Sequence, residues 1–216
     1  MHTCHLVAVI EEKGGVGKTT VSLTLAVAAV QAGRKVAVFD LDPQATAANW
    51  TDRREAEFPW VVATPAARLD AALANAKAQG VDFIVIDTPP KAGSDAVEAA
   101  RRADLVLVPV EPHMFTIETM PKLQDILKLA GNPPTLVVLS KAEVQGSEAA
   151  DTAVVLRAKG LDVCPVVIHR RAAHRHAGNV GKSAQEYEPK GKAAEEAKQL
   201  YMYTLKLLTE KGTRDA

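Results

Sequence analysis

The sequence predicts an α/β fold with a doubly wound, mostly parallel β-sheet and helices on both faces. Short runs rich in Val, Ile and Leu recur along the chain and are apolar almost without interruption, as in strands that are covered on both faces. Longer segments with Ala, Leu and charged residues at helical spacing lie between these runs, so strands and helices alternate. Hydrophobic residues make up 47% of the 216 positions, which is enough for one sizeable core. We therefore expect a single domain over residues 1–216.

The order of these segments gives the expected elements. The strands are predicted at Leu6–Ile10, Lys35–Phe39, Asp82–Ile86, Leu105–Val110, Thr135–Leu139 and Val163–Ile168. The helices are predicted at Thr19–Ala32, Pro65–Gln79, Ser94–Arg101, Thr116–Ala130, Ser147–Lys159 and Lys192–Leu208. Gly33 and Gly160 each follow a predicted helix, where glycine readily takes the left-handed conformation that ends it.

Composition and charge argue against several classes of protein. The 26 basic residues balance the 26 acidic ones, so the overall charge gives no indication of a nucleic-acid partner, and any such surface must be local. The two cysteines, Cys4 and Cys164, are far apart in the sequence and form no metal-ligand motif. No stretch approaches the roughly 20 apolar residues of a membrane span. These features predict a soluble protein of the reducing cytoplasm.

A glycine-rich loop separates the first predicted strand from the first predicted helix. It reads Lys13-Gly14-Gly15-Val16-Gly17-Lys18-Thr19-Thr20. Glycines let the backbone turn its N–H groups inward, and the helix N-terminus adds partial positive charge where a phosphate would lie. Lys18 is placed to reach the β- and γ-phosphates, the Thr19 hydroxyl to ligate Mg²⁺, and Thr20 to contact the α-phosphate. The loop therefore predicts a nucleoside triphosphate site with Mg²⁺.

Three carboxylates follow buried strands and belong to the same predicted site. Asp40 and Asp42 lie in the stretch Phe39-Asp40-Leu41-Asp42-Pro43-Gln44, and Asp87 lies in Phe83-Ile84-Val85-Ile86-Asp87-Thr88-Pro89-Pro90. The carboxyl ends of parallel strands meet at the edge where open α/β sheets bind their ligands. A single Asp after a strand is more often a helix cap or a turn residue, but three motifs in this order favour a functional site.

These stretches together resemble the ParA/MinD family of ATPases, whose deviant Walker A loop has a lysine at its head, as Lys13 is here. The resemblance extends from about Leu6 to Leu208, because Asn179–Leu200 also looks like the C-terminal segment of that family. It implies the P-loop NTPase fold, with ATP and Mg²⁺ as cofactors and hydrolysis of ATP to ADP and phosphate.

The resemblance also implies roles for individual residues. Lys13 would cross the interface of a nucleotide-sandwiched homodimer and touch the partner's phosphates, where a second cation neutralises developing charge. Lys18 would act on the phosphates of its own chain, and Asp42 would position or activate the attacking water. Asp40 and Asp87 would hold Mg²⁺ through its waters.

Other positions give weaker predictions. Ser140 and Lys141 lie where relatives contact the adenine base, although a plain strand-to-helix turn fits these residues equally well. Glu11 and Glu12 stand where the family commonly has an Asn-Gln pair, and these carboxylates are expected either to slow turnover or weaken nucleotide binding, or simply to point into solvent. Further candidates are Pro89, Pro90, Lys91 and Ser94 for a loop that senses the γ-phosphate, and Met114 and Phe115 for the dimer face.

Within the family the sequence most resembles the small, ParF-like plasmid-partition ATPases without an N-terminal DNA-binding extension. This likeness implies an ATPase that segregates a plasmid or other cargo, binds non-specific DNA, associates with the nucleoid when bound to ATP, and is stimulated by a small DNA-binding adaptor of the ParB or ParG kind. No Asp or Glu occurs from Cys164 to Gln185. The predicted DNA contacts are Arg170, Arg171, Arg175 and Lys182. A solvated face, or residues lining the nucleotide base, would explain the same segment.

Two other functions remain alternatives on the same fold. A small-molecule ligase or kinase would use a similar phosphate loop but would have no use for Lys13. A membrane-positioning ATPase of the MinD type would end in an amphipathic membrane helix. Apolar residues surround much of the segment Tyr201–Lys211 and its polar face is not strongly basic, which predicts that it packs on the sheet.

Overall fold

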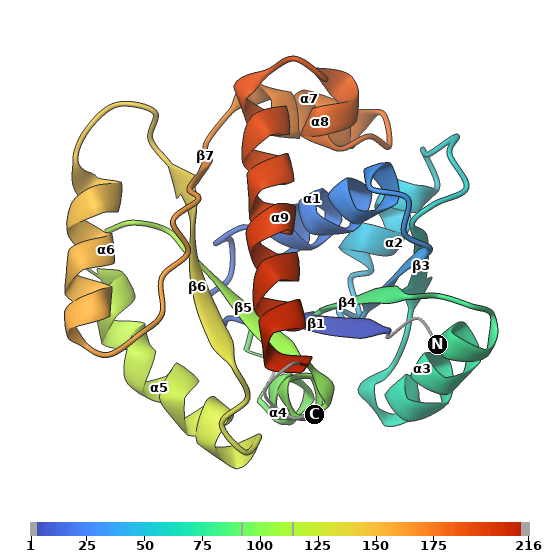
Figure 1. Ribbon diagram of the computed structural model, residues 1–216, viewed down its shortest axis with the longest axis horizontal. Coiled ribbons are helices and arrows are strands. Elements are labelled where there is room, and N and C mark those ends of the chain that lie inside the picture. The colour runs from blue at the N-terminus through green and yellow to red at the C-terminus, as the bar shows by residue number, and fades with distance from the viewer. Residues whose placement is uncertain (1–3, 92, 114, 213–216) are drawn as a thin grey trace.

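The computed structural model describes residues 4–91, 93–113 and 115–212 (Figure 1). Its strands are β1 (His5–Val9), β2 (Val36–Asp40), β3 (Trp60–Ala63), β4 (Phe83–Asp87), β5 (Leu105–Val110), β6 (Thr135–Ala142) and β7 (Ile168–His169). Over the described ranges they form one sheet in the order β3-β2-β4-β1-β5-β6-β7, and each neighbouring pair is parallel. The predicted α/β fold is confirmed, and the sheet is wholly parallel rather than mostly so.

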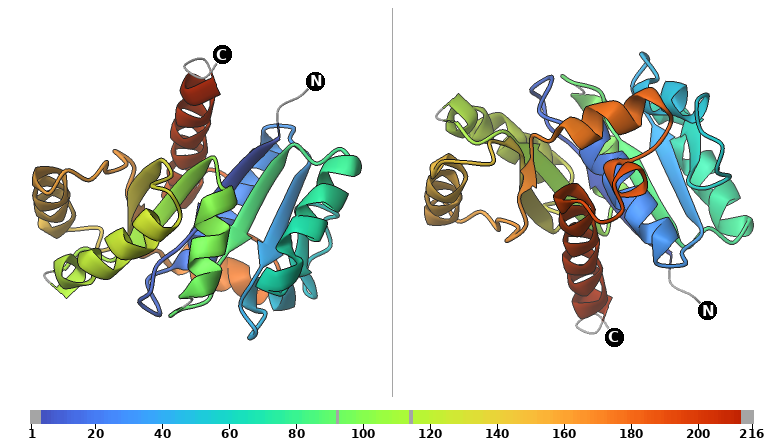
Figure 2. Two further views of the ribbon diagram at one scale, coloured as in Figure 1. Left: turned by 90° about the horizontal axis from the view of Figure 1, so that it is seen from below. Right: turned by 90° about the horizontal axis from the view of Figure 1, so that it is seen from above.

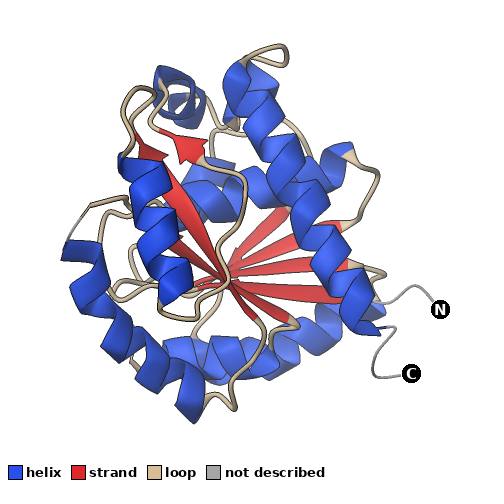
Figure 3. Cartoon of the chain, turned by 60° about the vertical axis from the view of Figure 1, so that its left-hand side comes forward, coloured by secondary structure: helices blue, strands red, loops and turns tan. Residues whose placement is uncertain are grey.

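Helices cover both faces of the sheet (Figures 2 and 3). They are α1 (Lys18–Gln31), α2 (Thr46–Thr51), α3 (Leu69–Ala78), α4 (Ser94–Arg102), α5 (Phe115–Leu129), α6 (Glu148–Ala158), α7 (Ala172–Asn179), α8 (Ala184–Tyr187) and α9 (Lys192–Gly212), with a 3₁₀ turn at Ala66–Arg68. The apolar residues of α3, α4, α5 and α6 pack on one face, and those of α1 and α9 pack on the other. The short helices α7 and α8 connect β7 to α9, and α8 contacts α1.

Strand β1 shows why the predicted strands are apolar at successive positions. Leu6 and Ala8 belong to the cluster with α3 to α6, whereas Val7 and Val9 belong to the cluster with α1 and α9. All four side chains are at most 5% exposed. Full burial of a Val or Leu side chain stabilises the fold by about 1.5–3 kcal/mol, so both faces of the strand favour apolar residues.

The C-terminal helix packs on the sheet, as predicted. Leu200, Tyr201 and Leu208 are buried in the same cluster as α1. The ring of Tyr201 meets the ring of Phe83 edge-on, with centroids 5.8 Å apart. The helix continues to Gly212, beyond the predicted end at Leu208. Among the described helices, none is long and apolar enough to cross a membrane.

The observed elements differ from the prediction at the two sides of the sheet. Strand β3 was not predicted, because it is a short edge strand whose Val62 and Ala63 are exposed and it therefore lacks a continuous apolar run. The prediction of a final strand at Val163–Ile168 is wrong in its bounds. Only Ile168–His169 forms β7, and Val163 makes an isolated bridge to Val137. Helices α2 and α8 are too short, at 6 and 4 residues, to show helical periodicity.

The carboxyl ends of the central strands bring the predicted site together. The pairing register places Val9 beside Asp87 and Asp40 beside Asp87, so β1, β2 and β4 end at the same level. Strand β1 lies between β4 and β5, where the order of the strands switches direction. Open α/β sheets bind their ligands at such a switch point.

Candidate nucleotide-binding site

The glycine-rich loop lies between the end of β1 and the start of α1. Gly15 and Gly17 have φ angles of 80° and 94°, in the left-handed region that glycine enters without steric cost. Gly17 is the N-cap of α1, and the first turn of this helix contains no acidic residue. The free N–H groups and the dipole of the helix therefore attract an anion to the loop.

Lys18 lies across this loop. Its side chain is nearly buried, and its amine donates hydrogen bonds to the carbonyl oxygens of Glu11 at 2.9 Å and Lys13 at 3.2 Å. Burial lowers the pKa of Lys18, while the carboxylates of Asp87 and Glu11 act in the opposite direction. Phosphate oxygens are stronger acceptors for an ammonium group than backbone carbonyls, so this amine is well placed to bind a phosphate.

Two buried carboxyl groups lie beneath the loop. Asp87 is 1% exposed, and Ser22 Oγ donates to its Oδ1 at 2.9 Å. Burial raises the pKa of Asp87 to about 7, although hydrogen bonds from Thr19 and Ser22 partly offset this effect. An acid that is buried with few compensating charges, next to a hydroxyl, suits a hydrated divalent cation, which would lower its pKa again. The predicted Mg²⁺ roles of Asp87 and Thr19 fit this arrangement.

Asp40 is also buried, but its oxygens are used by the backbone. Its Oδ1 accepts from the N–H of Asp42 at 3.0 Å, and its Oδ2 accepts from Ala47 at 2.9 Å and Ala48 at 3.2 Å, in the first turn of α2. Burial raises the pKa of Asp40, and these hydrogen bonds act against the rise. The predicted contact with Mg²⁺ waters stays a prediction, and the structure adds a second role, which is to fix α2 below the site.

Asp42 faces an open cavity above the glycine loop. The cavity has a volume of about 270 Å³ and is lined by Gly15, Gly17, Lys18, Thr19, Thr20, Asp42, Gln44, Thr88, Pro90 and Lys141. Asp42 Oδ1 accepts from the N–H of Gln44 at 2.9 Å, which holds the carboxylate at the rim. A group in this position can orient a water molecule toward a phosphate bound on the loop, as predicted for Asp42.

Ser140 and Lys141 contact the loop directly from the end of β6. Ser140 is buried and its Oγ donates to the carbonyl oxygen of Val16 at 2.6 Å. The Lys141 amine donates to the carbonyl oxygen of Gly15, and its carbon chain lies beside Gly17. The structure thus brings both residues to the site, at the loop itself.

A second cavity adjoins the first on the side of α7. It has a volume of about 520 Å³ and shares Gly17, Thr20 and Lys141 with the phosphate cavity. His169, Arg170, Arg171 and His174 form part of its wall. A nucleotide whose phosphates lie on the loop has room for its base here. This supports the interpretation that the basic segment, which is the acid-free stretch of residues 164–185, lines the base.

His174 in this cavity lies in the segment 164–185, and no individual role was predicted for it. Its Nε2 is buried and has no hydrogen-bond partner among the described residues. Burial lowers the pKa of His174, so the ring is neutral near pH 7. A neutral imidazole can donate to or accept from a base or ribose, and a cluster of histidines beside arginines gave no local signal for this role.

The basic segment is partly neutralised by carboxylates from distant parts of the chain. Arg170 pairs with Glu111 at 2.7 Å, and Arg171 pairs with Glu196 at 2.6 Å. Arg175 and Lys182 are exposed. The absence of acidic residues within the segment itself therefore does not leave all four predicted DNA contacts available.

The two glutamates before Lys13 do not both point into solvent. Glu11 is 4% exposed; its Oε1 accepts from the N–H of Lys13 at 3.2 Å, while its Oε2 has no partner among the described residues. Burial raises the pKa of Glu11. Glu12 Oε1 accepts from the N–H of Gly93 at 3.3 Å, and the Glu12 carbonyl oxygen accepts from the N–H of Lys91 at 3.0 Å. These contacts join the loop to the predicted switch after β4.

Other predicted positions are placed as follows. Pro90 lies beside Gly14, with its Cβ 3.7 Å from where a side chain on Gly14 would begin, and α4 starts at Ser94. Met114 and the side chain of Phe115 lie outside the described residues, so the predicted dimer face is not addressed there.

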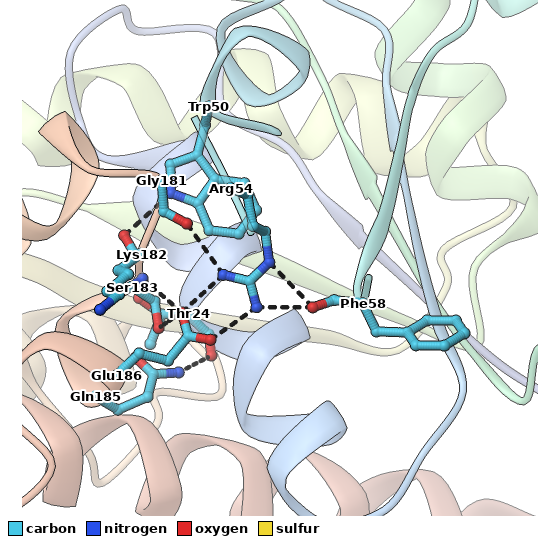
Figure 4. A network of polar contacts seen from close by, with 9 residues as sticks. All are labelled: Thr24, Trp50, Arg54, Phe58, Gly181, Lys182, Ser183, Gln185 and Glu186. Carbon is cyan, nitrogen blue, oxygen red and sulfur yellow. Dashed lines mark hydrogen bonds and ion pairs between the residues drawn. The ribbon is translucent and has the colours of Figure 1, made fainter. Parts of the chain in front are cut away.

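A network of polar contacts fixes α2 and the residues after it to the segment 181–186 (Figure 4). The side chain of Arg54 is 3% exposed and pairs with Glu186, and it also donates to the carbonyl oxygen of Gly181 at 3.0 Å. Its guanidinium lies 4.6 Å from the ring centre of Trp50, whose indole N–H donates to the carbonyl oxygen of Lys182 at 3.0 Å. The network thereby connects α2, whose first turn is held by Asp40, to the loop that contains Lys182.

Known proteins share both the sequence pattern and the fold of this chain. The family described as the CobQ/CobB/MinD/ParA nucleotide binding domain matches residues 7–184. The chain is similar to the maintenance of carboxysome distribution protein A of Gloeobacter kilaueensis, with 31% identity over 199 residues that cover 91% of this chain and 90% of that protein. It is also similar to the chromosome partitioning protein ParA of Caulobacter vibrioides, with 28% identity over 234 residues that cover 86% of this chain and 88% of that protein.

A solved structure agrees with the fold. The septum site-determining protein MinD of Pyrococcus horikoshii, complexed with Mg-ADP, matches with a TM-score of 0.73 and covers 94% of this chain and 96% of that one. At 20% identity this likeness concerns the fold alone.

Proposed function

This chain belongs to the CobQ/CobB/MinD/ParA nucleotide-binding family, and from this premise we propose that it is a positioning ATPase which hydrolyses ATP as a nucleotide-sandwiched homodimer. The observation that carries the proposal is the position of Lys13 at the head of a loop that already has Lys18 across it. One cation serves the phosphates of its own chain. A second cation at the head of the loop is useful when another copy of the chain presents its phosphates.

The phosphate site has groups suited to ATP and Mg²⁺. The N-terminus of α1 and the amine of Lys18 would hold the phosphates, and Thr19 with Asp87 would hold the cation or its waters. Bound Mg²⁺ would neutralise charge on the transferred phosphoryl group. Asp42, at the rim of the cavity, would orient the attacking water.

Lys13 makes hydrolysis depend on dimerisation in this proposal. A cation that reaches the partner's phosphates stabilises the transition state only while the two copies are together. Hydrolysis then removes the γ-phosphate contact and favours separation. The ATPase cycle therefore alternates between a dimer and a monomer.

We assign the working surface of the dimer to non-specific DNA, with a small DNA-binding adaptor as the protein that stimulates hydrolysis. Arg175 and Lys182 are exposed and support a phosphate contact. Arg170 and Arg171 would join them only if their pairs with Glu111 and Glu196 opened. Such a protein would associate with the nucleoid in its ATP-bound form.

We further propose that this ATPase positions a cargo within the cell. The two relatives described above are named for carboxysome distribution and for chromosome partitioning, so they support the positioning of a cargo in general. Plasmid partition, which the sequence predicted, is one case of this activity. Lys13 argues against an enzyme that acts on a small molecule, and the packing of α9 on the sheet argues against a membrane helix.

The proposal is tested by sedimentation of the protein with non-specific DNA in ATP, in ADP and without nucleotide. DNA binding should require ATP, and it should weaken steeply as the salt concentration rises. Lys13→Ala should still bind ATP, because Lys18 and the loop remain, but should lose the stimulated hydrolysis. Equal DNA binding in all three nucleotide states would contradict the proposal.

A further inference from the structure

The amine of Lys13 has a partner within its own chain. Lys13 Nζ lies 3.0 Å from His113 Nε2, in a partly buried contact between the head of the phosphate loop and the loop after β5, 100 positions further along the chain. The backbone of Lys13 is also held, because its N–H donates to Glu11 Oε1. A protonated amine can only donate hydrogen bonds, so His113 Nε2 accepts in this contact.

A second set of contacts surrounds His113. Glu111 Oε2 lies 4.0 Å from His113 Nε2, and Glu111 Oε1 accepts from Arg170 at 2.7 Å. Arg170 also lies 3.4 Å from Glu143. The Glu111 carboxylate therefore stands between the partner of Lys13 and the first arginine of the basic segment.

Two positions of the Lys13 amine exclude each other. On His113 the amine is held by its own chain, whereas the proposed reaction needs it on the phosphates of a second copy. This inference rests on the proposed function. We propose that His113 holds the Lys13 amine in the chain without a dimer partner, and that this hydrogen bond must break before the ATP-bound dimer can form. Hydrogen bonds from an ammonium group to charged phosphate oxygens are stronger than one to a ring nitrogen of histidine, so the partner's nucleotide can draw the amine away from His113.

The contact between Lys13 and His113 is tested on the full chain without nucleotide, by trace acetylation of lysines followed by mass spectrometry. Lys13 should react more slowly than Lys91, an exposed lysine in the loop after β4. His113→Phe should raise the reactivity of Lys13 by about two- to tenfold, the range that one net hydrogen bond supports, and leave Lys91 unchanged. His113→Gln keeps an acceptor and should restore most of the protection.

Equal reactivity of Lys13 in the original chain and in His113→Phe overturns the proposal. The thermal unfolding midpoint and the reactivity of Lys91 report whether the variant has kept its fold. If His113→Phe does not fold, His113→Ala takes its place and the same two outcomes decide.

The effect on assembly is measured by sedimentation with Mg-ATP. His113→Phe should lower the protein concentration at half-dimerisation by about two- to tenfold. In a Lys13→Ala background the same substitution should not change the concentration at half-dimerisation, because His113 then has no Lys13 amine to hold. A lower concentration in that background would contradict the proposal. If the original chain forms no ATP-dependent dimer, the proposed function fails, while the acetylation result still decides whether His113 holds Lys13.

Discussion

Arg54 is joined to Glu186 by two hydrogen bonds of 2.9 Å and 2.7 Å, although the residues are 132 positions apart in the sequence. The Arg54 side chain is 3% exposed and that of Glu186 is 21% exposed. Such a pair is largely shielded from solvent, and removing Arg54 leaves the Glu186 carboxylate with only the hydrogen bonds from Ser183 N–H and Oγ and without a compensating positive charge in the pair.

Replacing Arg54 by Met should lower the free energy of unfolding by about 3 kcal/mol, as measured by urea denaturation, because Glu186 would remain without its partner. The matched control is Arg101→Met. Arg101 pairs with Glu98 on the surface, with side-chain exposures of 51% and 36%, and its loss should cost less than about 1 kcal/mol. Similar losses in the two variants would show that the Arg54 pair has no special structural role.

Substitution of Gly17 by Ala should weaken ATP binding by more than it weakens the fold. Its φ of 94° is costly for a residue with a side chain, and its N–H belongs to the phosphate loop. Gly33→Ala is the control, because Gly33 has a φ of 85° at the end of α1, remote from the loop. Both variants should lose about 1–2 kcal/mol of stability, and only Gly17→Ala should raise the Kd for a fluorescent ATP analogue.

Glu11 should make the stability of the chain depend on pH. Burial raises the pKa of its carboxyl, so this group favours the folded chain while it is protonated, below its ordinary pKa. That contribution is lost as the pH rises through the raised pKa. Glu11→Gln removes the charge and keeps an acceptor for the Lys13 N–H, so its free energy of unfolding in urea should increase relative to that of the original chain as the pH rises above the ordinary carboxyl pKa of 4.5. Glu12→Gln serves as the control, and an equal trend in both variants would exclude Glu11 as the cause.

The two thiols should differ in reactivity. Cys164 is 2% exposed, and burial raises its pKa to about 11, so its thiolate is scarce at pH 8. Cys4 is half-buried, with a pKa that burial also raises. Iodoacetamide should therefore modify Cys4 first, with Cys164 reacting only as the chain unfolds. Rapid alkylation of Cys164 in the folded protein would contradict its burial in the apolar cluster that contains residues of α1 and α9.

Loss of an exposed lysine and loss of a carboxylate that pairs with an arginine should change the affinity for DNA in opposite directions. Lys182→Ala should weaken binding to all DNA sequences and reduce the salt dependence by about one ion. Glu111→Gln should strengthen binding, because it weakens the pair that occupies Arg170. Glu98→Gln is the control and should change neither, because Glu98 belongs to α4, which packs on the sheet face opposite to α1 and α9. Weaker DNA binding by Glu111→Gln would exclude Arg170 as a contact held in reserve.

Much of the fold could be predicted from the sequence because its signals are local. Buried parallel strands such as β1 and β4 require apolar residues on both faces, and this requirement is visible in any short window. Strand β3 escaped prediction because an edge strand needs apolar residues only in part. The bounds of β7 were wrong because two paired residues leave no pattern in the sequence.

The candidate site also has a part that could be predicted from local sequence and a part that depends on the tertiary structure. The sequence by itself determined the phosphate loop, since Lys13 to Thr20 are contiguous and their chemistry depends on the backbone that these residues adopt together. Tertiary structure alone decided that Lys13 rests on His113, that Arg170 and Arg171 are occupied by Glu111 and Glu196, and that Arg54 meets Glu186. These pairs join residues 25 to 132 positions apart. They exist because the winding order of the sheet brings loops and helices from separate parts of the chain together, and no local periodicity records that order.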